Sequence, residues 1–360
     1  MMKIFGQFRT QLKISLIRKP LFLFRIGLHF IKRYFKIGKP SLRSMDVMIN
    51  TECPCHCKHC FATSFAPSKN SSKKKLSTEE LTSALREAVL NGVFHFSLQG
   101  GEPFLHPHLK QIIKACEPDK SYITIVSNGT VADKKMLKKV YDLGVDKIAV
   151  SIDSYYPEEH DKFRGLKFAH KRAMETIRMA REVGLDVSIA ITVLNENIHT
   201  DSIQKLFDYA IKNNINVEIN IPQPIGNWDG KTDLLLKDKN IAYLEKLHKE
   251  HVNIRRDLYY HFGGSGCPAV KETLYLNIYG DIFPCVFMQI SIGNIRDHYL
   301  KDIRKNALSL HEFSVYGEKC LAGENKEFIR KYISKGFGVP KPADGFAIFG
   351  LQPLKKRIEK

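Results

Sequence analysis

The sequence predicts an α/β fold, an incomplete (β/α)6 barrel with a small C-terminal α+β extension, from three features. The first is an alternation of strand-like and helix-like segments, which in a chain of 360 residues is typical of right-handed βαβ units that share a parallel sheet. The second is a series of polar or glycine-rich motifs that directly follow four consecutive predicted strands. The third is the clustering of cysteines at two places, which indicates metal ligation in a reducing cytosol.

The alternation extends from residue 46 to residue 221. Strands are predicted at residues 46–50, 94–98, 122–127, 147–152, 186–193 and 216–221. Helices are predicted at residues 78–91, 106–116, 133–143, 168–183 and 199–213, and Ser77 is expected to cap the first of them. Because the chemistry of such barrels lies at the carboxyl ends of the strands, the motifs that follow the strands are the candidates for a site.

The first motif is a cysteine group that follows the first predicted strand. Cys53, Cys57 and Cys60 are spaced C-x3-C-x2-C, with Cys55 inside the first gap. Thiolates this close together on a loop indicate iron–sulfur or zinc ligation. A structural zinc needs four closed ligands, so a zinc knuckle that uses Cys55 stays as an alternative. A disulfide is disfavoured because nothing marks the chain for an oxidising compartment.

Three further motifs follow the next three predicted strands. They are Gly100-Gly101-Glu102-Pro103, Ser127-Asn128-Gly129-Thr130 and Ser151-Ile152-Asp153-Ser154. Two adjacent glycines let the backbone approach a ligand where a side chain would clash, and the Glu102 carboxylate can accept charge-assisted hydrogen bonds from an amino group. An ordinary turn is the alternative for each motif alone, whereas their order along the predicted sheet indicates a common site.

The cysteine group, with His59 before its last cysteine, and the Gly-Gly-Glu-Pro motif resemble those of radical S-adenosylmethionine (SAM) enzymes. The resemblance covers roughly residues 46–225 and implies a partial TIM barrel that holds a [4Fe–4S] cluster on three thiolates, with SAM on the open iron. The cluster ligands that it implies are Cys53, Cys57 and Cys60. The SAM contacts that it implies are Gly100, Gly101 and Glu102 at the methionyl amino group, Ser151 at the ribose, Arg164 at the carboxylate, and Asn128 close by, with a looser match to adenine contacts at residues 192–195.

The same resemblance implies the chemistry. A reduced cluster passes one electron to the sulfonium of SAM, which breaks into methionine and a 5′-deoxyadenosyl radical, and that radical abstracts hydrogen from a carbon atom of the substrate. The resemblance also implies a separate electron donor of the flavodoxin or ferredoxin type.

A second cysteine group, Cys267, Cys285 and Cys320, lies near the C-terminus. Residues 274–285 predict a β-hairpin around a turn at residues 279–281, and a helix is predicted near residues 298–310. This segment resembles the SPASM or shorter twitch extension of radical SAM enzymes. It has fewer cysteines than the long version, so the resemblance implies one auxiliary [4Fe–4S] cluster on these three thiolates. The fourth ligand would be Glu318, Glu324, His311, water or the substrate.

Not every cysteine is necessarily a metal ligand. The three at the C-terminus are alternatively buried and unliganded, because free cysteine is often buried. Cys116, on a predicted helix, is expected in the core.

The net charge of +18 is concentrated at the N-terminus, where residues 1–40 carry ten cations and no acid. A helix is predicted over residues 21–35, with Phe24, Leu28, Ile31 and Phe35 on one face and cations on the other. This pattern is typical of a helix in a membrane interface whose cations reach anionic lipid. A helix packed on the enzyme and a nucleic-acid-binding segment are the alternatives. No membrane span and no secretory signal are expected.

The predicted organisation is a basic arm (residues 1–45), a catalytic core (46–250), an iron–sulfur domain (251–330) and a tail (331–360). The predicted function is that of a radical SAM enzyme in the cytoplasm, peripheral on the inner face of the membrane, with a lipid or membrane-associated substrate. A peptide-modifying maturase is an alternative, although no N-terminal peptide-binding domain is expected in the arm. A non-enzymatic iron–sulfur sensor that binds nucleic acid is disfavoured, because it leaves the Gly-Gly-Glu-Pro motif without a purpose, so no nucleic-acid partner is expected.

Overall fold

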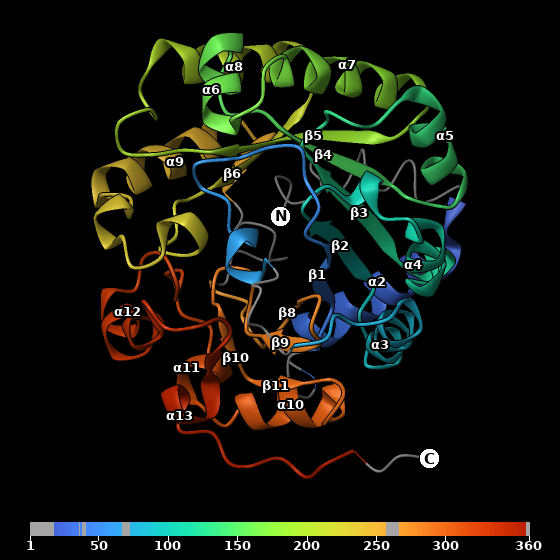
Figure 1. Ribbon diagram of the computed structural model, residues 1–360, viewed down its shortest axis with the longest axis vertical. Helices are drawn as coiled ribbons and strands as arrows, with labels where there is room; N and C mark the ends of the chain where they lie inside the picture. The colour runs from blue at the N-terminus through green and yellow to red at the C-terminus, as the bar shows by residue number, and fades with distance from the viewer. Residues whose placement is uncertain (1–17, 36, 38–40, 67–72, 257–265, 358–360) are drawn as a thin grey trace.

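The computed structural model describes residues 18–35, 37, 41–66, 73–256 and 266–357, and it is organised around one large sheet (Figure 1). The order of the strands in this sheet is β11-β9-β8-β1-β2-β3-β4-β5-β6-β7, and a small second sheet pairs β10 with β12. From β8 through β7 every pair of neighbours is parallel, as a βαβ barrel requires. The prediction of a mostly parallel, partial barrel is therefore confirmed.

The barrel strands are short, and the side chains of the three central ones, at residues 122–127, 147–151 and 186–192, are almost entirely buried. They are β1 (Ser44–Asn50), β2 (His95–Gly100), β3 (Tyr122–Ser127), β4 (Lys147–Ser151), β5 (Asp186–Thr192), β6 (Asn216–Asn220) and β7 (Ile254–Arg256). The first six correspond to the predicted strands. The seventh strand was not predicted, since three residues are too few to give a periodic pattern.

Helices on the outside of the barrel connect the strands (Figure 1). They are α3 (Thr78–Leu90), α4 (Leu109–Ala115), α5 (Lys134–Asp142), α6 (Pro157–Arg164), α7 (Ala169–Glu182), α8 (Asp201–Lys212) and α9 (Asp238–Glu250). Helix α3 begins where predicted, because the Ser77 hydroxyl accepts from the Glu80 backbone N–H while the Glu80 carboxylate accepts from the Ser77 N–H. Helix α6 was not predicted, and it lies directly above the cysteine loop.

The C-terminal extension continues the same sheet. Strand β8 (Thr273–Leu276) pairs parallel with β1, and β9 (Asp281–Phe283) returns antiparallel to β8, so the predicted hairpin is present. The remaining elements are β10 (Ile290–Ser291), β11 (Gly293–Asn294), α10 (Leu300–Ala307), α11 (His311–Ser314), α12 (Lys326–Lys331), β12 (Ala343–Asp344) and α13 (Gly345–Phe349). Barrel and extension share one hydrophobic core. The domain limits stay predictions; β7, beyond the predicted limit at residue 250, pairs with β6 of the barrel.

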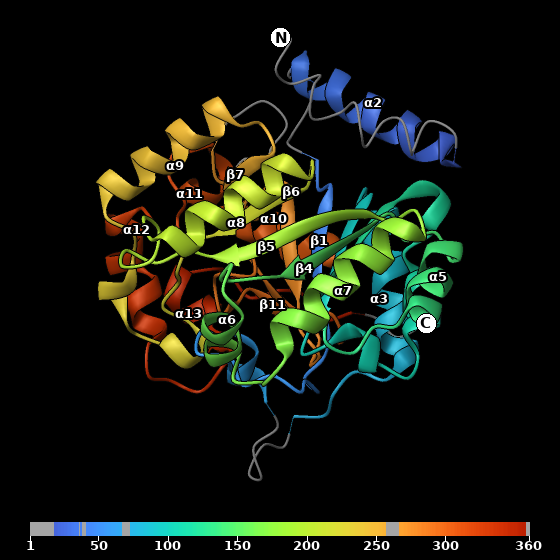
Figure 2. The ribbon, with the colours of Figure 1, turned by 90° about the horizontal axis from the view of Figure 1, so that it is seen from above.

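Helix α2 (Pro20–Tyr34) matches the predicted N-terminal helix and lies against one end of the barrel (Figure 2). Its buried apolar side chains are Phe22 and Ile26, which contact Phe94 and Tyr122 at the starts of two strands. The predicted apolar face, by contrast, is exposed. The helix therefore packs on the enzyme by a face that the periodicity did not single out. In the part of the chain that the structure describes, no helix has the length and hydropathy to cross a membrane.

Candidate active site

One cavity, of about 510 Å³, brings the two cysteine groups together. It runs along the inside of the barrel and ends between the cysteine loop and the C-terminal extension. The cysteines that line it are Cys53, Cys55, Cys57, Cys60, Cys267, Cys285 and Cys320. Cys116 is fully buried in the core at the end of α4, as the sequence predicts. The structure thus gathers all six predicted cysteine ligands around a single space.

The cysteine loop is fastened to the barrel by backbone hydrogen bonds. The His56 and Lys58 N–H groups donate to the carbonyls of Arg164 and Phe163 at the end of α6, at 2.9 and 3.1 Å. From the other side, Asn227 donates through its backbone N–H to the Cys60 carbonyl and through its amide to the Cys57 carbonyl. These bonds hold the loop over the barrel without using any thiol.

A glycine makes the second of these contacts possible. Gly226, in the short helix η4 (Gly226–Trp228), has a φ of 61°, and a Cβ there would lie 2.1 Å from the Cys60 carbonyl oxygen. Only glycine permits this approach.

The thiols of the loop influence one another. The Cys55 thiol donates hydrogen bonds to the sulfurs of Cys53 and Cys57, which lowers the pKa of Cys53 to about 6 and that of Cys57 to about 7. The same bonds raise the pKa of Cys55 itself well above its ordinary value. Burial raises the pKa of Cys60. The lowered pKa values favour the thiolate form of Cys53 and Cys57 near neutral pH, and the thiolate is the form that binds iron.

The Gly-Gly-Glu-Pro motif is built into the end of β2. A Cβ at Gly100 would lie 2.4 Å from the Asn50 carbonyl oxygen, and one at Gly101 would lie 2.3 Å from that of Glu52. Both glycines line the cavity, but the approach that demands glycine is to the chain after β1. The close contact with the chain after β1 is thus a second reason for glycine at these two positions, besides the predicted approach of a ligand.

Glu102 differs from its predicted role more clearly. Its side chain is 0% exposed and does not line the cavity. The carboxylate accepts hydrogen bonds from the Ser127 hydroxyl and from the backbone N–H groups of Asn128 and Phe104. Burial raises the pKa of Glu102 to about 7. In this arrangement the carboxylate joins the second and third motifs, and a contact with an amino group of SAM stays a prediction.

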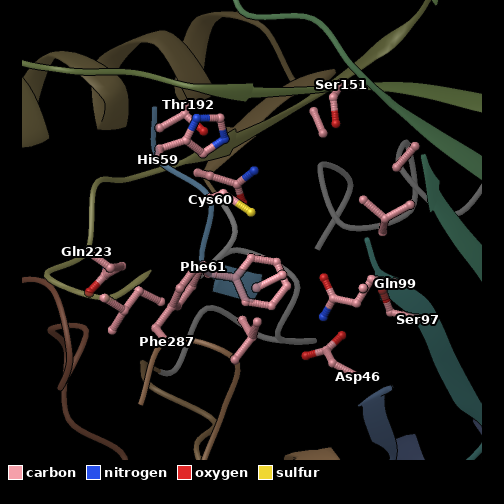
Figure 3. A pocket seen from close by; sticks show the side chains of 18 of the residues that line it. Asp46, His59, Cys60, Phe61, Ser97, Gln99, Ser151, Thr192, Gln223 and Phe287 are labelled. Atoms are coloured by element: carbon pink, nitrogen blue, oxygen red, sulfur yellow. The ribbon is translucent and has the colours of Figure 1, made fainter. Parts of the chain in front are cut away.

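Ser151, Asn128 and Arg164, the other predicted SAM contacts, all line the cavity. The Asn128 amide donates to the Cys53 sulfur at 3.3 Å, so this residue contacts the cysteine loop directly. The Arg164 guanidinium donates to the Asp153 carboxylate at 2.6 Å and approaches the Cys57 sulfur at 3.7 Å. Figure 3 shows Ser151 and Thr192 at the strand ends on the same side of the cavity as His59.

The C-terminal cysteines form the opposite wall. Burial raises the pKa of Cys267, Cys285 and Cys320, and the negative charge that Cys267 would carry raises the pKa of Cys285 and Cys320 further. Of the predicted fourth ligands, Glu324 contacts a cluster cysteine but does not line the cavity: its carboxylate accepts from the Cys320 backbone N–H at 2.8 Å and forms a buried ion pair with Arg256. His311 and Glu318 are exposed and do not line the cavity.

The residues present fit iron–sulfur clusters better than a single metal ion. Within the described residues, no three side chains of the His, Cys, Asp or Glu type are arranged to hold one ion. A [4Fe–4S] cluster instead takes each thiolate on a different iron, so the three thiols of one wall do not have to converge on a single point. Three cysteines on each wall are available, with Cys55 in excess.

Several residues of the cavity had no role assigned to them from the sequence. The His59 ring stacks on Phe163 at 4.8 Å and lies 5.7 Å from the ring of Trp228, and burial lowers the pKa of His59 to about 4. Gln223, only 4% exposed, lines the cavity with neither amide atom hydrogen-bonded within the described part of the chain. Figure 3 shows a polar wall as well. Its residues are Asp46, Ser97 and Gln99, from β1 and β2. Their alternation along strands was the available signal.

Comparison with protein families supports this arrangement. Residues 47–210 match the model of the Radical SAM superfamily, and residues 267–325 match that of the iron–sulfur cluster-binding SPASM domain. The two matched segments contain the first and the second cysteine group, respectively. The first model implies a SAM-binding [4Fe–4S] cluster, and the second implies an auxiliary iron–sulfur cluster.

The sequence identity to individual relatives is low. The chain is 24% identical over 285 residues to an AdoMet-dependent heme synthase of Methanosarcina barkeri, which covers 71% of this chain and 80% of that protein. It is 28% identical over 262 residues to the antilisterial bacteriocin subtilosin biosynthesis protein AlbA of Bacillus subtilis, which covers 68% of this chain and 55% of AlbA. The match thus spans about half of AlbA.

Solved structures share the fold. SuiB of Streptococcus suis bound to its precursor peptide SuiA superposes with a TM-score of 0.57 at 18% identity, over 77% of this chain and 68% of that one. Native anSMEcpe with bound AdoMet gives 0.58 at 18% identity, over 75% of this chain and 83% of that one. At this identity the likeness shows the fold alone.

Proposed function

The chain belongs to the radical SAM superfamily and carries a C-terminal SPASM domain, and on this premise we propose that it cleaves SAM reductively and abstracts hydrogen from a substrate held between its two cysteine groups. When bound, the reduced cluster supplies the electron that breaks the carbon–sulfur bond of SAM. The observation that carries the proposal is the single cavity lined by both groups of cysteines.

The proposed roles of the residues follow from their positions. Cys53, Cys57 and Cys60 hold the first cluster, and the Asn128 amide and the Arg164 guanidinium stabilise the negative sulfurs beside them. Arg164, held by Asp153, is also the cation available for the carboxylate of SAM. The buried strands behind these groups keep water away from the radical.

The ligand assignment is tested by SAM cleavage. Anaerobically reconstituted protein is expected to form 5′-deoxyadenosine under reduction, and Cys53→Ala, Cys57→Ala and Cys60→Ala should each abolish it. Cys116→Ala, which removes a thiol outside the cavity, is the matched control and should retain activity.

Cys55→Ala should leave cleavage largely intact, because Cys55 lies outside the three-thiolate spacing. Because the Cys55 thiol donates to Cys53 and Cys57, we expect a shift of the pH dependence of cluster assembly to higher pH rather than a loss of the cluster. Loss of cleavage equal to that in Cys53→Ala would contradict the assignment.

We also propose that the enzyme works at an anionic membrane surface, with a lipid or another membrane-associated molecule as its substrate. The supporting observation is the exposed apolar face of α2, in an arm that carries ten cations and no acid over residues 1–40. Phe24→Ser should reduce the fraction of protein that sediments with anionic vesicles at low salt. Phe168→Ser, which removes an equally accessible ring at the cysteine-loop end, should not.

A peptide substrate is the second candidate. AlbA is named for the biosynthesis of a bacteriocin, and a PqqA peptide cyclase of Rhizobium meliloti is 27% identical over 169 residues, or 47% of this chain and 44% of that protein. The two candidates are separated by incubating the reduced enzyme and SAM with the lipid and the peptide fractions of one cell extract. A SAM-dependent mass change in the peptide fraction alone would replace the lipid proposal.

A further inference from the structure

We infer that helix α2 docks the enzyme on an anionic bilayer, with the α2 end of the barrel next to the membrane and the opening of the cavity facing water. The substrate then enters from the aqueous side. This inference rests on the proposed membrane attachment and deepens it. It also narrows the proposed lipid or membrane-associated substrate to a molecule that leaves the bilayer, because a molecule that stays embedded in it could not reach the opening.

The first step is that α2 is held rigidly at the amino-terminal ends of the strands. The Lys19 ammonium is buried and donates to the carboxylate of Asp146, just before β4, and to the carbonyls of Ser121 and Gly144. Arg25 donates to the carbonyl of Val89, at the end of α3.

Aromatic packing fixes the same helix over two more strands. The Phe22 ring lies 6.1 Å from that of Phe94, just before β2, and 5.9 Å from that of Tyr122, at the start of β3. The helix therefore spans the starts of three neighbouring strands, and its orientation relative to the barrel is determined by contacts on both of its flanks.

The second step is that the outer face of α2 is apolar and exposed. Phe24 is 71% exposed, and the other members of this face are Leu21, Leu28, Ile31 and Phe35, each at least 41% exposed. A row of five exposed apolar side chains on one helix is unusual for a surface that meets only water. We refer to these five residues as the outer face.

The charge around the outer face selects its partner. Residues 1–40 contain ten cations and no acid, and with Lys19 buried against Asp146 the other nine still leave the segment complementary to a negative surface. An exposed apolar helix face in a segment of this charge matches the headgroup and acyl boundary of a bilayer that contains anionic lipid, where the rings are buried and the cations stay among phosphates. A second copy of the chain would bring two such cationic segments together, which electrostatic repulsion opposes.

The third step is that the cavity opens at the opposite end. At the end near α2, the cavity is closed by buried side chains, among them Arg43, Ser44 and Lys147. The exposed residues of its lining are His56, Thr63 and Ala66, all on the cysteine loop and the short helix η1 (Ala62–Phe65) that follows it.

The two ends are well separated. Figure 2 shows α2 at one end of the barrel and α6, which holds the cysteine loop, at the other. The seven residues of β5 alone span about 23 Å along the barrel. Attachment by α2 therefore places the opening more than a headgroup layer away from the bilayer.

The chain provides its own reporter for this orientation. Its single tryptophan, Trp228, lines the cavity beside His59, at the cysteine-loop end. Vesicles of phosphatidylglycerol and phosphatidylcholine with brominated acyl chains quench only indole rings that enter the membrane. The wild type then reports on the opening, and a Phe24→Trp/Trp228→Phe variant reports on the outer face.

The variant is expected to lose roughly half of its fluorescence on such vesicles, since the outer face is buried at the acyl boundary, while wild-type Trp228 should change little. Vesicles without bromine are the control for any change caused by binding alone. Phe24 is exposed, so its replacement by tryptophan disturbs no buried contact.

Each other outcome overturns the inference. Quenching of Trp228 as strong as that of the variant would mean that the opening faces the membrane. Absence of quenching in both proteins would mean that the outer face does not enter a bilayer. A protein that is dimeric in sedimentation velocity, and monomeric after Phe24→Ser, would assign the face to a second copy. SAM cleavage measured without vesicles in the same preparation separates these results from a failure of the proposed chemistry.

Discussion

Glu102 is the residue whose position changes its interpretation most. Its carboxylate accepts hydrogen bonds from Ser127 and Asn128 at the end of β3 and from Phe104 in the short helix η2 (Pro103–Leu105). The side chain is not exposed to solvent. Burial raises its pKa from 4.5 to about 7, although each of these hydrogen bonds opposes the shift. Glu102 therefore connects, through hydrogen bonds, two motifs that line the cavity. Because its pKa differs from the ordinary value in the folded protein, the stability of the fold depends on its protonation.

The sign of this linkage can be tested by comparing the wild type with Glu102→Gln. Because the pKa is higher in the folded protein, the group stabilises the fold fully below about pH 4.5, and that contribution is lost as the pH rises through about 7. The free energy of unfolding of the wild type, relative to the variant, should fall by about 3 kcal/mol over this window. Urea unfolding at several pH values measures it; a difference that does not change with pH would contradict the shift.

At the scale of an element, α2 shows that amphipathicity does not say which face meets the protein. Its predicted stripe is exposed, and the enzyme is contacted instead by Phe22, Ile26 and the buried Lys19. Burial lowers the pKa of Lys19, while the charge of Asp146 opposes the shift. Deleting residues 1–40 would therefore remove buried contacts along with the exposed face, so single substitutions on the helix are the cleaner experiment.

Two phenylalanines of α2 provide a matched pair. Phe22→Ala should lower the free energy of unfolding by about 3 kcal/mol, since it leaves a cavity against Phe94 and Tyr122. Phe24→Ala should change it by less than about 0.5 kcal/mol, because Phe24 is 71% exposed. Thermal or urea unfolding of both variants makes the comparison. Equal losses would mean that both rings are packed on the protein.

At the scale of the whole molecule, the extension and the barrel form one body around the cavity. Strand β8 pairs with β1, the strand that precedes the cysteine loop, so the second cysteine group is brought to the first by the sheet itself. The Gln289 amide adds a contact to the Phe61 carbonyl across the same junction. Because both cysteine groups belong to one body, we expect the intact chain to hold one cluster on each group.

Iron content tests that property. The wild type should hold about one four-iron cluster more than a Cys267→Ala/Cys285→Ala/Cys320→Ala variant, after anaerobic reconstitution of both. Cys53→Ala/Cys57→Ala/Cys60→Ala should lose the same amount, while Cys116→Ala should lose none. If the first variant holds as much iron as the wild type, its cysteines are structural and the assignment of a second cluster to them is wrong.

The sequence by itself predicted the first six barrel strands and both cysteine groups, because short apolar segments that alternate with helical patterns, and the positions of cysteines, are local properties of the chain. It also predicted the hairpin at residues 274–285, since a glycine-containing turn between apolar segments needs no distant partner.

Only the tertiary structure decided which side chains face the cavity, which face of α2 is buried, and that Glu102 is enclosed while Gln223 is not hydrogen-bonded within the described residues. Each of these depends on contacts between residues far apart in the chain, such as the 127 positions between Lys19 and Asp146. Local periodicity describes what a helix or strand can present, whereas burial against a distant partner selects the side that is used.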